Sequence, residues 1–184
     1  HQGRAYHPIR GGDIARFDPT SGKLDRLKQT IDGQPPKADS HLADEHGHPI
    51  SWDISPDGKT LYAVAMSTNK LYRYDLTATG DTLAGTTVGE LVPGAKNTDC
   101  RAMCVGPSGR VWASVTRADG GTQWHHLVSY TPRAAALIDH GVLTVKNPDF
   151  TAFVDAQGKP LPYHAGFFKL ADGTLTTRYV TMGV

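Results

Sequence analysis

The sequence lacks the features that mark several classes of protein. No apolar run approaches the roughly 20 residues that span a membrane, so no membrane span is expected. The 19 basic and 18 acidic residues are interspersed and leave a net charge of +1, which argues against nucleic acid and anionic membranes as partners. No signal-peptide pattern follows His1, so either no such segment existed, it was removed, or the chain begins inside a longer protein.

Cysteine is also scarce, with only Cys100 and Cys104. If the two residues share one strand, their Cα atoms lie roughly 13 Å apart, which is too far for a disulfide. We predict two free thiols in a buried strand. Such thiols do not indicate a cellular compartment.

What the sequence does contain is a repeated hairpin motif. Three segments each read as a short apolar strand, a turn ending in glycine, and a second strand: PISWDISPDGKTLYAVAM (49–66), CRAMCVGPSGRVWASVT (100–116) and HAGFFKLADGTLTTRYV (164–180). Asp-Gly and Ser-Gly turns between apolar runs favour hairpins, because glycine adopts a positive φ without steric cost.

A second repeated motif is a further pair of strands around a turn. It occurs in DIARFDPTSGKLDRL (13–27), KLYRYDLTATGDTL (70–83) and HLVSYTPRAAALIDHGVL (126–143). The aromatic residues Phe17, Tyr74 and Tyr130 recur at the same place, 57 and 56 positions apart. We predict that they pack between neighbouring units, together with Tyr62 and Tyr72.

Together the two motifs make a unit of four short antiparallel strands. Such units in series, with almost no helical periodicity, predict an all-β chain and a β-propeller built of four-stranded blades. The alternative is a β-sandwich, which would not need the same motif three times. The predicted single domain, 1–184, holds the outer two strands of one blade (1–28), two blades (48–95 and 98–145), and the inner two strands of another blade (162–184).

This count gives about three blades, whereas closed propellers need at least about four. We therefore expect a fragment of a larger propeller of about six to eight blades. Exposed sheet edges or missing blades would then be sites of association with other chains or segments.

The segment ISPDGKTLYAVAMSTNKLYRYDL (54–76) resembles the blade sequence of YVTN and lactonase-like β-propeller proteins. The resemblance is good over this blade and partial over VGPSGRVWASV (105–115). Enzymes and scaffolds share these blades, so the resemblance implies the fold far more than an activity. It also implies a bacterial protein that is secreted or periplasmic.

The repeat predicts which distant residues meet, because the inner strands of a propeller line its central channel. Counting back from the turn glycines places several side chains at the mouths of these strands: His48, Asp99, Arg101, Tyr163 and His164. The predicted connecting segments 1–12 and 117–126 on the same face add Arg4, Trp124 and His126. Two long segments, 29–49 and 144–164, are predicted on this face, and long loops in compact domains are often functional.

These residue types suit a defined set of reactions. His46, His48 and His164 would form a three-His site for a divalent metal such as Zn, Mn or Ca. Alternatively, His48 or His164 with Tyr163 would serve as base and acid, and Arg101 would pair with a substrate carboxylate. The alternatives are structural roles, namely a solvated turn at His46–His48 and a salt bridge between blades at Arg101.

The remaining predicted residues would bind substrate: Trp124, by stacking on a sugar ring, and His126, Asp99 and Arg4. The sequence thus predicts a propeller-face enzyme that acts on a small-molecule or glycan substrate, either as a carbohydrate lyase or on a lactone. The alternatives are a non-catalytic propeller that binds a protein or glycan, and a structural fragment whose active site lies elsewhere.

Overall fold

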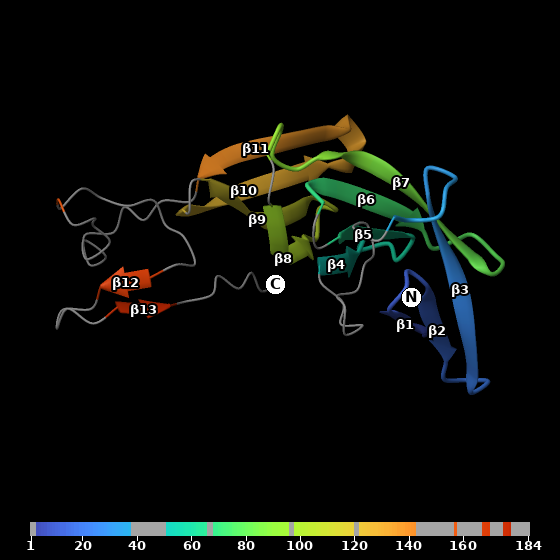
Figure 1. Ribbon diagram of the computed structural model, residues 1–184. Helices are drawn as coiled ribbons and strands as arrows, with labels where there is room; N and C mark the ends of the chain where they lie inside the picture. The colour runs from blue at the N-terminus through green and yellow to red at the C-terminus, as the bar shows by residue number, and fades with distance from the viewer. Residues whose placement is uncertain are drawn as a thin grey trace.

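The computed structural model describes residues 3–37, 51–65, 68–95, 98–119, 122–142, 157, 167–169 and 175–177, and within these ranges the chain is built from strands (Figure 1). The strands of the first half are β1 (Ala5–Pro8), β2 (Ile14–Asp18), β3 (Lys23–Ile31), β4 (Ser51–Ile54), β5 (Thr60–Val64), β6 (Lys70–Asp75) and β7 (Thr82–Glu90). Those of the second half are β8 (Thr98–Val105), β9 (Val111–Asp119), β10 (Thr122–Thr131), β11 (Ala136–Val142), β12 (Phe167–Lys169) and β13 (Leu175–Thr177). A short 3₁₀ helix, η2 (Pro132–Ala134), joins β10 to β11.

Two sets of four consecutive strands form antiparallel meanders, β4–β7 and β8–β11. Their first hairpins turn at Gly58 and Gly109, which have φ values of 70° and 80°. A side chain there would strain the backbone, so the glycines fix the turns. The third predicted hairpin is present as the antiparallel pair β12–β13, although its turn lies outside the described residues. The prediction of an all-β fold is confirmed, and the arrangement is compatible with a partial β-propeller.

The beginning of the chain differs from the prediction in one respect. Residues 1–12 were expected to be a connecting loop, but Ala5–Pro8 form strand β1, which pairs with β2. The terminal unit therefore has three strands. Its outer strand β3 also pairs in parallel with β7 over Lys28–Ile31 and Thr82–Gly85, which joins β1–β3 and β4–β7 into one seven-stranded sheet.

A second correction concerns residues 117–126, which were expected to form a long connection. Strand β9 continues to Asp119 and β10 begins at Thr122, so this segment belongs to an extended hairpin. His125 and His126 are therefore successive strand residues, and their side chains point to opposite faces.

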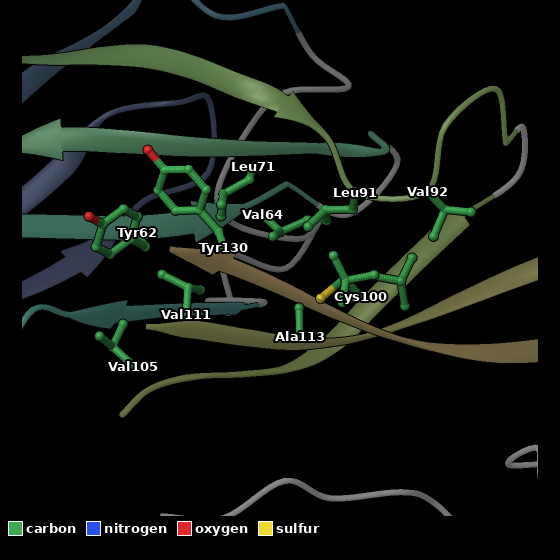
Figure 2. Close-up of a cluster of buried hydrophobic side chains, with 12 residues drawn as sticks. Tyr62, Val64, Leu71, Leu91, Val92, Cys100, Val105, Val111, Ala113 and Tyr130 are labelled. Carbon is green, nitrogen blue, oxygen red and sulfur yellow. The ribbon is translucent and has the colours of Figure 1, made fainter. Parts of the chain in front are cut away.

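Apolar clusters cover both faces of the β4–β7 sheet. One face packs on β8–β10 through side chains that include Val64, Leu71, Val105, Val111 and Tyr130 (Figure 2). The other face packs on β2 and β3 through a second cluster that includes Ile14. Burying each large aliphatic side chain of this kind contributes roughly 1.5–3 kcal/mol, so these two clusters hold the three strand units together.

The predicted packing of the aromatic residues is confirmed for four of the five positions. Tyr62, Tyr72, Tyr74 and Tyr130 are buried. The rings of Tyr62 and Tyr130 meet edge to face between the two sheets, with centroids 6.0 Å apart. Phe17 is the exception and is 42% exposed. It lies three residues after the buried Ile14 on β2, so the alternation of a strand turns it to the opposite face.

Within the described ranges, no helix is long and apolar enough to cross a membrane.

Candidate functional site

The candidate site is built where β8 begins, β9 ends and β10 begins. The register of the three strands sets their residues in lateral rows. One row consists of Thr98, Arg117 and Trp124, the next of Asp99, Thr116 and His125, and the third of Cys100, Val115 and His126. Polar and aromatic residues that are far apart in sequence thus lie side by side at one end of one sheet. We call this end the β8–β10 rim.

The middle row is a group of polar side chains in which His125 is buried and Asp99 and Thr116 are partly buried. The imidazole Nδ1 of His125 lies 3.1 Å from the hydroxyl Oγ1 of Thr116. His125 is only 5% exposed, and both its Nε2 atom and the Oδ1 atom of Asp99 are buried. Because burying polar atoms costs free energy, a cluster of them at strand ends is more typical of a functional site than of a structural surface.

Arg101 lies two residues after Asp99, at an irregularity in β8. The pairing of β8 with β9 shifts between Cys100 and Ala102, so Arg101 occupies a β-bulge. Bulges locally bend a strand and redirect a side chain, and they are common next to active sites. The bulge therefore sets Arg101 apart from the regular ladder at the same rim that carries Asp99.

His126 lies on the opposite face of β10 from His125. Its side chain is buried, and its Nδ1 atom lies 2.9 Å from Oδ2 of Asp139 on β11. This contact ties the imidazole to the outer edge of the sheet. The structure thus gives His126 a partner within the fold, while its predicted contact with substrate stays a prediction.

The inner strands of the two sheets begin close to each other, as the repeat predicted. The hydroxyl of Ser51, the first residue of β4, donates a hydrogen bond to the carbonyl oxygen of Cys100 at 2.9 Å. Four predicted site residues lie outside the described residues: His46, His48, Tyr163 and His164.

Among the predicted residues that the structure describes, Arg4 alone lies next to the other sheet. It precedes β1, and its Nε atom is 3.2 Å from Oδ2 of Asp18 on β2. The rim therefore does not include Arg4. Sequence reasoning grouped it with the other residues because it took residues 1–12 for a loop on the ligand face.

Two residues of the middle row were not among the predicted site residues. Thr116 gave no signal in the sequence, because it reads as an ordinary strand residue. His125 stands in a His-His pair, but only the strand register shows that it, and not His126, shares a row with Asp99. No group of three His, Cys, Asp or Glu side chains suited to a metal occurs within the described parts of the chain.

The two thiols next to the rim are free, as the sequence predicted, although Cys104 is only partly buried. Burial raises the pKa of the Cys100 thiol to about 12, and burial with the nearby carboxylate of Asp53 raises the pKa of Cys104. A raised pKa keeps a thiol protonated and unreactive at neutral pH.

We expect a thiol reagent at pH 8 to label Cys104 slowly and Cys100 only after unfolding, measured by mass spectrometry with and without urea. Rapid labelling of Cys100 in the folded protein would contradict this.

Comparisons with known proteins identify no family. No family model matches the chain, and no curated protein matches it. Solved structures with a similar fold include the tricorn protease, with a TM-score of 0.48 and 11% identity, over 78% of this chain and 12% of that protein. A luciferin-regenerating enzyme gives a TM-score of 0.46 and 10% identity, over 73% of this chain and 39% of the other.

A third similar structure is described as a 6-phosphogluconolactonase from Bacteroides uniformis. Its TM-score is 0.38 with 17% identity, over 92% of this chain and 46% of the other. The chain thus spans less than half of the length of each of these proteins. The class that the fold defines is an all-β protein with the strand units of a partial β-propeller.

Proposed function

We propose that the chain is part of a β-propeller enzyme that acts on a carbohydrate or sugar lactone at the β8–β10 rim. The observation that carries the proposal is the row of Asp99, Thr116 and the buried His125, at the same strand end as the irregularity at Arg101. A carboxylate, an imidazole and a guanidinium on adjacent strands supply the groups that acyl chemistry on a sugar ring requires.

The reaction that suits these groups best is the hydrolysis of a sugar lactone. A general base takes a proton from water, the water oxygen attacks the lactone carbonyl carbon, and the ring ester bond breaks. The ring oxygen then receives a proton and leaves as a hydroxyl, and the product is a sugar acid. Arg101 would stabilise the developing oxyanion and then pair with the product carboxylate.

The base in this scheme is Asp99, or one of His48 and His164, whose predicted positions belong to the same face. Trp124 stands in the row next to Asp99 and would contact the sugar ring. A divalent metal held by His46, His48 and His164 would polarise the lactone carbonyl, and this part of the proposal rests on the sequence alone. We also keep as a proposal that the protein acts outside the cytoplasm.

The test is turnover of two substrate classes by the purified chain and by Arg101→Gln. Proton release reports hydrolysis of aldonolactones, and ultraviolet absorbance reports the unsaturated product of a uronic-acid lyase. We expect lactone hydrolysis that falls by about 100-fold in Arg101→Gln, in line with the loss of a single oxyanion donor. Metal content measured by mass spectrometry, followed by chelation, tests the predicted divalent ion separately.

The matched control is Arg133→Gln, in the 3₁₀ helix η2 between β10 and β11. It removes the same charge from the same sheet, away from the β8–β10 rim, and is expected to leave turnover unchanged. Equal activity in the two variants would contradict the role of Arg101. Turnover of the uronate substrate alone would replace hydrolysis with β-elimination, and binding of sugars without turnover of either class would favour a non-catalytic propeller.

A further inference from the structure

The beginning of β1 repeats the beginning of β9 in both sequence and backbone. Gly3-Arg4-Ala5-Tyr6 corresponds to Gly109-Arg110-Val111-Trp112. Gly3 has a φ of 74° and Gly109 a φ of 80°, and each strand begins two residues after its glycine. Gly109 ends the turn of the β8–β9 hairpin. Gly3 therefore has the same backbone conformation as the glycine that ends the β8–β9 turn.

The edge of β1 that faces away from β2 borders a groove. In the described part of the chain β1 pairs only with β2. On the side facing the next unit, a groove of about 200 Å³ is lined by Arg4, Tyr6, Trp52, Asp53, Ile54, Leu61 and Leu76. We call it the β1–β4 groove. Its lining is mainly aromatic and aliphatic, which is typical of a surface that packs against a strand.

In the interface between the two complete meanders, an inner strand occupies the place that corresponds to the groove. Trp52 and Ile54 stand six and four residues before the turn glycine Gly58, as Met103 and Val105 stand before Gly109. Met103 and Val105 pack into the cluster between the sheets, where the neighbouring inner strand β4 lies against β8. In the next unit, Trp52 and Ile54 pack against the second cluster and line the β1–β4 groove.

A backbone N–H group also differs between the two interfaces, in the position of its hydrogen-bond acceptor. In the complete interface, the carboxylate of Asp53 on β4 accepts the N–H of Val105 on β8 at 2.7 Å. The equivalent donor in the next unit is the N–H of Ile54, which is bonded to Oδ1 of its own neighbour Asp53 at 2.8 Å. A polar side chain from an inner strand beside β1 would reach this donor in the same way.

We infer that the β1–β4 groove is the binding position of an inner β-strand that leads into β1 through the Gly3 turn. The strand pairs antiparallel with β1 and turns an acceptor side chain toward Ile54. This occupant completes a four-stranded unit and covers the apolar lining of the groove. The proposal concerns assembly of the propeller and does not depend on the proposed enzymatic function.

The experiment supplies this strand from sequences that the chain already contains. Copies of Ser51–Ile54 and Gly106–Ser108 are fused directly before Gly3, in place of His1 and Gln2. The Gly106–Ser108 turn is used because Gly109 and Gly3 precede their strands by the same spacing. In the copied strand, Asp53 then lies opposite Tyr6, as Cys104 lies opposite Trp112. Hydrogen exchange of the β1 amides, measured by mass spectrometry, is the readout.

We expect exchange over Ala5–Pro8 to slow by about tenfold relative to the parent chain, and the urea midpoint to rise. The matched control is the same extension with Asp53→Pro in the copied strand, which removes one backbone donor and the acceptor side chain. It should behave as the parent chain does. Equal protection of β1 in the extension and its proline control would overturn the inference, as would protection confined to residues outside β1.

Discussion

Replacing Gly85 by alanine is expected to lower the free energy of unfolding by about 3 kcal/mol, at the upper end of the usual cost of overpacking a core. Gly85 lies directly opposite Tyr74 in the β6–β7 pair. A Cβ atom at position 85 would overlap Cε1 of the tyrosine ring and lie 2.9 Å from its Cδ1 and Cζ. The ring has no room to move, because it is fully buried and Gln29 donates a hydrogen bond to its hydroxyl. Urea unfolding followed by circular dichroism measures the loss.

Gly89→Ala is the matched control for this prediction. It makes the same change in the same strand, but its Cβ would meet only Cδ2 of Leu137 at 3.7 Å, an ordinary van der Waals contact. Its effect should stay below about 1 kcal/mol. Combining Gly85→Ala with Tyr74→Leu should cost less than the sum of the two single changes, because the colliding ring is gone. Strict additivity would show that the ring is not the cause.

The second large effect is expected at Asp53, where alanine should cost about 2 to 3 kcal/mol. One carboxylate serves two sheets, since Oδ2 accepts the N–H of Val105 on β8 and Oδ1 accepts the N–H of Ile54 on β4. Val105 is buried, so its donor would lose its partner in a place with little access to water. A hydrogen bond to a charged group contributes about 1.5–3 kcal/mol, and leaving a buried donor unpaired costs a similar amount.

Asp53→Asn separates the charge from the geometry. Asparagine keeps one acceptor oxygen and the shape of the side chain, so about half of the loss is expected to be recovered. A second readout is the thiol of Cys104, whose pKa the Asp53 carboxylate raises. Labelling of Cys104 should therefore become faster in folded Asp53→Asn. If both variants unfold at the same urea concentration as the parent chain, Asp53 does not link the sheets.

Much of the fold was predictable from local signals. The glycines at positions 58 and 109 indicate turns, because only glycine adopts a positive φ at no cost. The alternation of apolar residues predicts the strands that follow. Phe17 shows the limit of this reasoning. Its place in the repeat matches Tyr74 and Tyr130, but the face on which it lies depends on the register of β2, which a repeat count does not contain.

The candidate site was predictable only in part, for the same reason. Counting from turn glycines brought Asp99 and Arg101 to one strand end, because that count follows a single strand. It could not bring Thr116 and His125 to Asp99, since their meeting depends on the pairing of three strands. Arg4 was misplaced because a short strand of four residues, with Pro8 at its end, gives almost no periodic signal.

The parallel pairing of β3 with β7 changes how the molecule should respond to stress. Repeats that meet only through side chains can unfold one at a time. Here backbone hydrogen bonds join the first unit to the second, and in one of them the N–H of Lys28 donates to the carbonyl oxygen of Asp81 at 2.7 Å. These two units should therefore open together as one cooperative block. The β8–β11 meander, which is joined to them by side-chain contacts and the Asp53 bridge, is the part that can detach first.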